Sequence, residues 1–265
     1  MNDMFLGLSY QNHLYASVSA LHSKVFPKYK NCLNDREAVI VASGPTVNFY
    51  DPSLLKEATY VAVNGSFHQD KIDFDWLFLQ DYSGLKQSVS EIPSAENLKK
   101  AKKFYGIMKP VPDKMLIPEQ YAIRDGAERY IAHSVCYDNG KLLPYIDWGL
   151  DLSAEPFMCH GTIALIALQF LLYANAKKIY LVGCDCSTSG HFSKNMEKQV
   201  TADDEISVWQ IGYKKFKRFA EIHYPDTEII SVNPIGLTGL FHDVYTETFL
   251  TEHPEIDRNT VNVLK

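Results

Sequence analysis

Short apolar runs alternate with longer amphipathic segments along most of this chain. Runs with the length and residue types of buried strands occupy 38–42, 59–63, 74–79, 104–107, 179–182 and 227–232. Apolar residues at helical spacing predict helices over 11–26, 163–175 and 206–222, with further helical segments at 52–56 and 88–103. Strands that alternate with helices favour a mostly parallel sheet with helices on both faces.

This order of elements predicts one Rossmann-like α/β domain over residues 37–245. A helix and a polar connector over 1–36 precede it, and a polar, loosely packed tail over 246–265 follows. Residues 110–156 are rich in Pro, Gly and Tyr and show no regular period, which is typical of a lid or an insertion. The chain contains neither a dinucleotide fingerprint nor a Walker A sequence.

Composition narrows the class of protein. The 265 residues are 46% hydrophobic and 22% charged, the balance of a soluble globular protein, and the net charge of -6 argues against nucleic acid as a partner. No apolar run is long enough to cross a bilayer, and no signal peptide is recognisable. We therefore expect a cytoplasmic protein, and peripheral contact with the inner face of the membrane is compatible with this.

The five cysteines suggest reduced thiols. Cys184 and Cys186 form a C-x-C pair without a second pair at metal-ligand spacing, so we expect no zinc site and no other metal. Small residues at the end of a strand explain this pair equally well.

Polar residues follow three successive strands. The first strand ends at Ser43-Gly44-Pro45-Thr46, a turn in which glycine admits close backbone approach to a phosphate and hydroxyls add donors. The second ends at Asn64-Gly65-Ser66, where Asn64 can contact a ligand or simply tolerate a left-handed backbone. The third ends at Asp81, which can accept from a hydroxyl or cap a loop. We expect all of these residues to line a nucleotide site.

The stretch from 177 to 192 is the most informative part of the chain. Its strand ends at Gly183 and is followed by Asp185, Ser187 and His191. A histidine there can accept a proton from an attacking hydroxyl, and Asp185 can orient it. The competing base is His160, whose place before a helix N-terminus would depress its pKa. We expect His160, Gly161, Thr162 and Ser187 to contact substrate.

The irregular segment supplies a second group of candidates. Arginine pairs with diphosphate or carboxylate, and tyrosine hydroxyls can donate to a leaving phosphate. Arg124, Arg129, Tyr137 and Tyr145 could do so, or could be surface and packing residues.

Three blocks carry a resemblance to known families: VIVASGPT at 39–46, YVAVNGSF at 60–67, and HGTIALIALQFLLYANAKKIYLVGCDCS at 160–187 followed by GHF at 190–192. They resemble a bacterial domain of unknown function related to the 6-hydroxymethylpterin diphosphokinase-like (MptE-like) domain, which also occurs in motility-associated flagellin glycosylation factors. Its layout is similar to that of the Campylobacter-type sialyltransferases, which use CMP-sialic acid.

The resemblance implies specific roles. In those sialyltransferases a G-P-S turn and a later asparagine contact the CMP donor, a histidine is the base, tyrosines assist the leaving phosphate and no metal is required. Carried over, Ser43–Thr46 and Asn64 would line the nucleotide site and His191 would be the base. The turn here is A-S-G-P-T rather than G-x-G-P-S, and the base of those enzymes lies further beyond its strand than His191 does.

The leading hypothesis is therefore a metal-independent glycosyltransferase of bacterial surface-glycan assembly, such as lipopolysaccharide or capsule. It would transfer a sugar, such as a sialic-acid-like one, from a CMP-type donor to a hydroxyl of a glycan or glycoprotein, with no cofactor besides this donor. A second hypothesis is a Mg²⁺- and ATP-dependent pterin-type diphosphokinase with Asp81 and Asp185 as metal ligands. A third is a non-catalytic nucleotide- or glycan-binding domain.

Overall fold

The structure is a computed structural model that describes residues 2–80, 86–109, 117–134, 147–192 and 203–265. In this part of the chain ten strands form one sheet, and every strand pair is parallel. The order across the sheet is β10-β9-β8-β7-β1-β2-β3-β4-β5-β6. The strands are β1 (Glu37–Val41), β2 (Thr59–Val63), β3 (Trp76–Leu79), β4 (Lys102–Lys109), β5 (Glu128–Ser134), β6 (Phe157–Cys159), β7 (Lys178–Val182), β8 (Glu228–Val232), β9 (His242–Tyr245) and β10 (Asn262–Val263).

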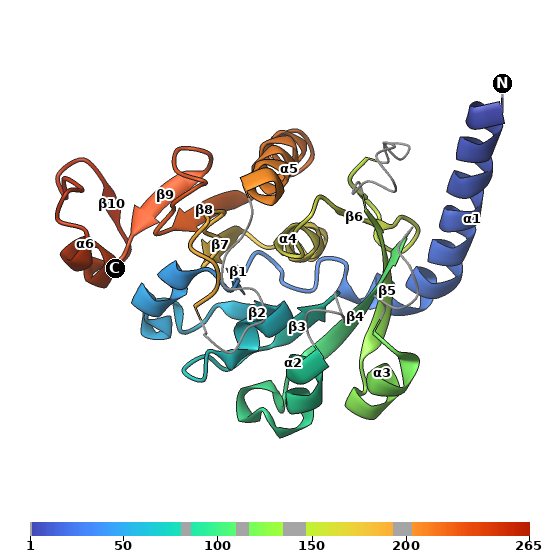
Figure 1. Cartoon of the computed structure of the whole chain (residues 1–265), viewed down its shortest axis with the longest axis horizontal. Coiled ribbons are helices and arrows are strands. Elements are labelled where there is room, and N and C mark those ends of the chain that lie inside the picture. Colours follow the sequence, from blue (N-terminus) through green and yellow to red (C-terminus); the bar gives the residue numbers. More distant parts are fainter. Residues whose placement is uncertain (1, 81–85, 110–116, 135–146, 193–202) are drawn as a thin grey trace.

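The strand order reverses direction beside β1. From β1 to β6 each strand is added on one side of its predecessor, and the chain then returns through α4 (Ala164–Tyr173) to β7, on the other side of β1. Strands β8 to β10 continue outward from there. The carboxyl ends of all strands lie on the edge that faces the viewer in Figure 1. Open parallel sheets bind ligands at this edge, at the point where the strand order reverses.

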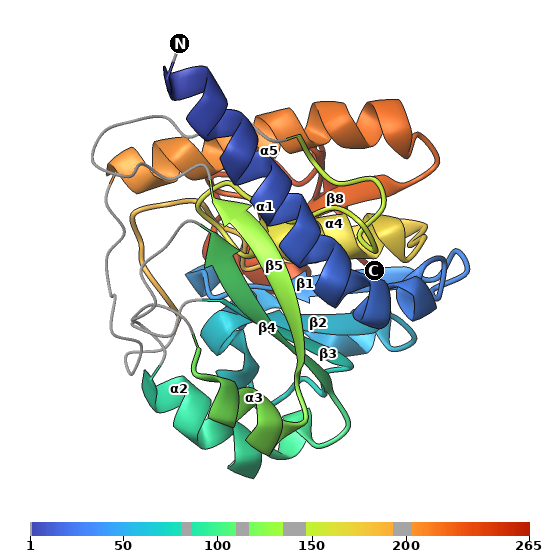
Figure 2. The ribbon, with the colours of Figure 1, turned by 90° about the vertical axis from the view of Figure 1, so that its right-hand side faces the viewer.

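Helices cover both faces of the sheet, as the sequence predicts. The helices α1 (Asn2–Val25), α4 and α5 (Asp203–His223) lie on one face, and α2 (Lys86–Glu91) and α3 (Glu119–Asp125) lie on the other (Figures 1 and 2). Alternate residues of β1 enter the two cores: Ala38 and Ile40 belong to the cluster that contains residues of α1 and α4, and Val39 and Val41 belong to the cluster on the other face. A strand buried on both faces therefore has a continuous apolar sequence.

One polar residue within the apolar helix α4 has a clear structural role. Gln169 is 2% exposed, and its Oε1 accepts from the amide of Met158 at 2.9 Å while its Nε2 donates to the Met158 carbonyl at 2.7 Å. Met158 lies on β6, the outermost strand at that side of the sheet. The Gln169 side chain thus makes the two hydrogen bonds that a neighbouring strand would otherwise make with the Met158 backbone.

Two predictions about irregular regions need correction. The segment predicted as an irregular insertion over 110–156 contains α3 and all of β5, and β5 forms a long parallel pair with β4. The expected loose tail over 246–265 contains α6 (Glu247–Glu252) and β10, and both Phe249 and Leu250 are buried. The described residues include no helix that is both long and apolar enough to span a membrane.

Candidate functional site

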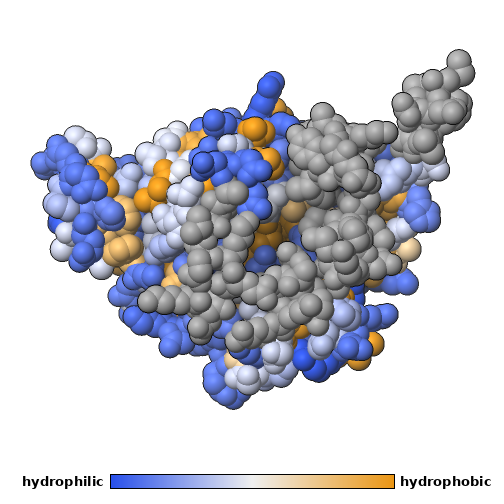
Figure 3. All heavy atoms as spheres, in the orientation of Figure 1, coloured by the Kyte–Doolittle hydropathy of each residue, from blue (hydrophilic) through white to orange (hydrophobic). Residues whose placement is uncertain are grey.

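A pocket lies at the carboxyl edge of the sheet where the strand order reverses. Its volume is about 170 Å³, and the ends of β1, β2 and β7, the segment before α4 and one face of α5 surround it. Figure 3 shows this face of the molecule, which is hollowed near its middle. The lining residues are Ala42, Ser43, Gly44, Val63, Asn64, Gly161, Thr162, Ile163, Ala164, Gly183, Cys184, Asp185, Cys186, Ser187, Gly190, His191, Trp209 and Tyr213.

Hydrogen bonds join the loop after β1 to the loop after β7. The amide of Gly44 donates to the carbonyl of Gly183 at 2.8 Å, and the amide of Phe192 donates to the carbonyl of Ser43 at 2.8 Å. These bonds fix the two loops on which most of the predicted site residues lie. The loops after β1 and β7 therefore line one pocket.

Gly44 is required at this junction by space rather than by backbone conformation. Its φ of -66° is ordinary for any residue. A Cβ atom on Gly44 would lie 2.5 Å from the carbonyl oxygen of Gly183 and 2.7 Å from Oδ2 of Asp185. Real Cβ atoms do not come this close to neighbours, so a side chain here would separate the two loops.

Asp185 lies in the floor of the pocket with neutral partners. Its side chain accepts from the amide of Thr46 at 3.0 Å through Oδ2 and from the Thr46 hydroxyl through Oδ1. Burial raises the pKa of Asp185, and the two bonds from Thr46 act in the opposite direction. We expected this carboxylate to orient His191, whereas both of its oxygens are paired with Thr46. Thr46 itself is buried and lies outside the lining.

His191 and Ser43 form the second polar pair of the pocket. Nδ1 of His191 lies 2.7 Å from Oγ of Ser43, and both side chains are half-buried. Which atom donates depends on the tautomer of the imidazole. If Nδ1 carries the proton and donates to Ser43, the lone pair of Nε2 can accept a proton from a ligand. Ser43 would then fix the ring in the orientation that a general base needs.

Asn64 occupies the end of β2 and combines two roles. Its φ of 49° is left-handed, as the structural alternative for this residue predicts, and its Oδ1 accepts from the amide of Gln80 at 3.2 Å. Its Nδ2 has no hydrogen-bond partner within the described residues and can donate to a ligand in the pocket. By contrast, Pro45, Gly65 and Ser66 lie outside the lining, and the Ser66 hydroxyl instead accepts from the amide of Val63 at 2.9 Å.

The segment before α4 contributes main-chain donors. Gly161 has a φ of +82°, and the Thr162 hydroxyl accepts from the amide of Ala164 at 3.4 Å, a long contact for a cap. The amides of Gly161 and Thr162 donate to no acceptor in the described part of the chain. Unpaired amides at the start of a helix favour an anion, because the helix dipole adds to them. Ser187 also lines the pocket.

His160 is a packing residue rather than a pocket residue. It is 7% exposed, stacks on Trp148 with ring centroids 6.3 Å apart and lies against Gly212 of α5. Its pKa is lowered first by burial and then by the charge of Lys215. The predicted direction of this shift is confirmed, but the predicted cause, the helix N-terminus, is not the main one.

Sequence reasoning missed two aromatic residues of the pocket. Trp209 and Tyr213 are four residues apart on α5, so they share one face of the helix. The spacing alone could have identified a common face, but not that this face borders the pocket. Tyr213 is 1% exposed, and its side chain hydrogen-bonds with those of Thr162 and Cys184.

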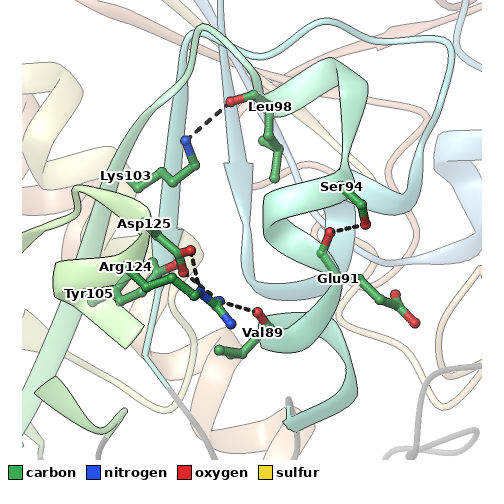
Figure 4. Close-up of polar contacts among 8 residues, drawn as sticks. All are labelled: Val89, Glu91, Ser94, Leu98, Lys103, Tyr105, Arg124 and Asp125. Carbon is green, nitrogen blue, oxygen red and sulfur yellow. Dashed lines mark hydrogen bonds and ion pairs between the residues drawn. The ribbon is translucent and has the colours of Figure 1, made fainter. Parts of the chain in front are cut away.

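The candidates from the irregular segment lie elsewhere or outside the described residues. The Arg124 guanidinium donates to Asp125 at 2.7 and 2.8 Å and to the Val89 carbonyl at 2.7 Å, which ties α3 to α2 (Figure 4). Arg129 lies on β5, away from the lining. Asp81, Tyr137 and Tyr145 fall outside the described residues. Among the described residues no cluster of three or more His, Cys, Asp or Glu could hold a metal ion.

Comparisons with known proteins give a distant likeness in structure only. No protein-family model and no curated protein sequence matches the chain, so membership of the MptE-like family stays a prediction. The sialyltransferase CstII from Campylobacter jejuni with cytidine-5'-monophosphate is 12% identical, covers 74% of this chain and 79% of its own, and has a TM-score of 0.41. The same enzyme with CMP-3FNeuAc is 13% identical, with coverages of 87% and 86% and a TM-score of 0.39.

Proposed function

We propose that the protein is a glycosyltransferase that moves a sugar from a CMP-type nucleotide donor to a hydroxyl of a glycan or glycoprotein, without a metal ion. One observation carries this proposal. The Ser43–His191 pair, the Asn64 amide and the start of α4 face the same pocket where the strand order reverses. This arrangement offers a base, a neutral polar donor and an anion site within one cavity.

The reaction would use His191 as its general base. The acceptor hydroxyl attacks the anomeric carbon of the donor sugar while Nε2 of His191 takes the hydroxyl proton. The new bond joins the acceptor oxygen to the sugar, and the bond between the sugar and the phosphate oxygen breaks. Ser43 acts as a positioning residue, because the 2.7 Å contact with Nδ1 fixes the imidazole ring.

The leaving nucleoside monophosphate carries away negative charge. The unpaired amides of Gly161 and Thr162 and the dipole of α4 would stabilise this phosphate. Nδ2 of Asn64 would donate to the ribose or to the phosphate. Asp185 would act indirectly, because its bonds with Thr46 hold the loops after β1 and β7 together.

A thermal-shift screen tests the nucleotide class. CMP, CDP, UDP, GDP and ATP are each added with Mg²⁺ and with a chelator, and binding to the folded state raises the melting temperature. We expect CMP and CDP each to raise the melting temperature by the same amount with the chelator as with Mg²⁺. Stabilisation by ATP only, and only with Mg²⁺, would instead favour a diphosphokinase. Stabilisation by CMP without any sugar transfer, across a broad acceptor panel, would favour a binding domain.

A variant of the base tests the mechanism. His191→Ala is expected to lower turnover by roughly 10²- to 10⁴-fold and to keep the stabilisation by CMP, because the base acts on the acceptor. The matched control is His242→Ala, an exposed histidine at the start of β9 and therefore at the opposite edge of the sheet. Full turnover in His191→Ala would exclude this histidine as the base.

A further inference from the structure

The proposed reaction leaves one large side chain of the pocket without a role. Trp209 lines the cavity from α5 and is half-buried. Tyr213, one turn further on, is nearly inaccessible to solvent, and its side chain hydrogen-bonds with those of Thr162 and Cys184. Trp209 is therefore the aromatic residue of this helix face whose ring keeps a surface for a ligand.

The indole of Trp209 rests directly on the backbone that precedes α4. A Cβ atom on Gly161 would lie 2.8 Å from Cδ1 of Trp209 and 3.0 Å from its Nε1. The ring can occupy this place only because residue 161 is glycine. It is therefore held beside the two amides that would bind the phosphate of the donor, within reach of a group attached to that phosphate.

The chemistry of the lining points to the kind of group that Trp209 contacts. The other side chains of the pocket are small, are the aliphatic Val63 and Ile163, or carry a hydroxyl, thiol, amide, imidazole or carboxylate group, and none of the described lining residues is Lys or Arg. A flat indole in such surroundings recognises a flat ring by its face. Stacking of a nucleobase on an aromatic side chain contributes about 1–3 kcal/mol, and every base offers such a face.

We propose that Trp209 is the residue that binds the nucleobase of the donor, by stacking its indole on the cytosine ring. This inference rests on the proposed function, since it assumes a nucleotide in the pocket. It assigns α5 to the nucleoside and leaves the Ser43–His191 pair to the acceptor hydroxyl.

Tryptophan fluorescence gives a direct readout that does not depend on turnover. The chain has three tryptophans, and Trp76 and Trp148 are 8% and 5% exposed and lie outside the pocket. CMP should therefore change the emission of Trp209 alone. The change should saturate with CMP in the unaltered protein and disappear in Trp209→Phe, in which the phenyl ring keeps most of the binding. A change of equal size in Trp209→Phe would overturn the proposal.

A pair of ligands separates base stacking from general damage to the pocket. Trp209→Leu should weaken the binding of CMP by about tenfold and leave the binding of ribose 5-phosphate, which lacks the base, unchanged. Calorimetric titration measures both, and thermal melts of Trp209→Phe and Trp209→Leu check that each variant is folded. Equal weakening of both ligands, or no weakening of CMP, would overturn the stacking role.

These outcomes also separate the inference from the function on which it rests. CMP binding that is insensitive to Trp209 leaves the glycosyltransferase proposal intact and removes only the stacking role. Failure of every nucleotide to bind the unaltered protein overturns both proposals. If Trp209→Leu binds CMP normally but binds the complete donor more weakly, the sugar rather than the base lies against the indole. This result would also overturn the inference.

Discussion

Two aspartates in this molecule have largely buried side chains but opposite kinds of partner. The Asp125 side chain is 2% exposed and binds the guanidinium of the adjacent Arg124 and the hydroxyl of Tyr105 at 2.6 Å (Figure 4). Asp185 is 5% exposed and binds the amide and hydroxyl of Thr46, which is distant in sequence. One carboxylate is balanced by a cation, and the other has no Lys or Arg partner within the described residues.

The difference separates scaffold from site. A buried carboxylate without a cation is destabilising unless hydrogen bonds satisfy it, and such groups concentrate where a protein needs a polarised pocket. Asp125 lies where α2, α3 and β4 meet, and it is not among the residues that line the pocket. Asp185 lines the pocket and joins two loops.

The largest expected effect is that of a substitution at Gly44, which contacts Asp185, compared with the same substitution at Gly126, which follows Asp125. Gly44→Ala would place a methyl group within 2.7 Å of both Asp185 Oδ2 and the Gly183 carbonyl, so we expect a loss of about 3 kcal/mol in unfolding free energy. Gly126→Ala, just after Asp125, meets no atom within 4 Å and suffers only from its φ of +60°, a loss of about 1 kcal/mol. Urea denaturation measures both.

The same pair of variants also tests the site. Gly44→Ala should abolish the stabilisation by CMP, because the loops after β1 and β7 move apart. Gly126→Ala should retain it in full. Equal losses of stability in the two variants, or normal CMP binding by Gly44→Ala, would contradict the difference that we draw between the regions.

An intermediate effect is expected for the carboxylate of Asp185. In Asp185→Asn only one side-chain atom can accept, so one of the two Thr46 donors loses its partner at a loss of about 2 kcal/mol. The size of this loss should depend on pH. Because the folded protein raises the pKa of Asp185, its stabilising contribution is complete below the unfolded pKa and is lost as pH rises through the folded pKa.

Urea denaturation at several pH values measures this dependence. The advantage of the unaltered protein over Asp185→Asn should be greater near the unfolded pKa, about 4, than at pH 7. A difference that is constant between these values would mean that Asp185 is not held in the surroundings described here. A difference that grows with pH would mean that its pKa is lowered, for instance by an unrecognised cation.

The strands that form the centre of the sheet could be predicted from sequence, and those near its margin could not. The runs that became β1, β2 and β7 are apolar throughout, since both faces are buried. The sequence of β5 contains polar residues whose partners are far away: Lys28 pairs with Glu128 at 2.5 Å, and Nδ1 of His133 lies 3.0 Å from the Tyr10 hydroxyl. No local window contains these partners, so β5 appeared irregular.

The site shows the same limit. Strand ends could be identified, and Ser43, Asn64, Asp185 and His191 do line one pocket. The pairing within the pocket could not be predicted, because Thr46 reaches Asp185 and Ser43 reaches His191 across more than a hundred residues. Trp209 was missed for a related reason. Its helix was predicted, but which face borders the pocket depends on how α5 packs on Gly161.

The smallest expected effect concerns Arg124, which the sequence offered as a ligand for diphosphate. Arg124→Ala removes two bonds to Asp125 and one to the Val89 carbonyl, but the guanidinium is more than one-third exposed, so water can replace it. We expect a loss of about 1 kcal/mol in unfolding free energy and no change in the melting shift produced by CMP. Since α3 borders no part of the pocket, a smaller CMP shift in Arg124→Ala would mean that the α2–α3 region reaches the bound nucleotide. The contrast between a scaffold aspartate and a site aspartate would then no longer hold.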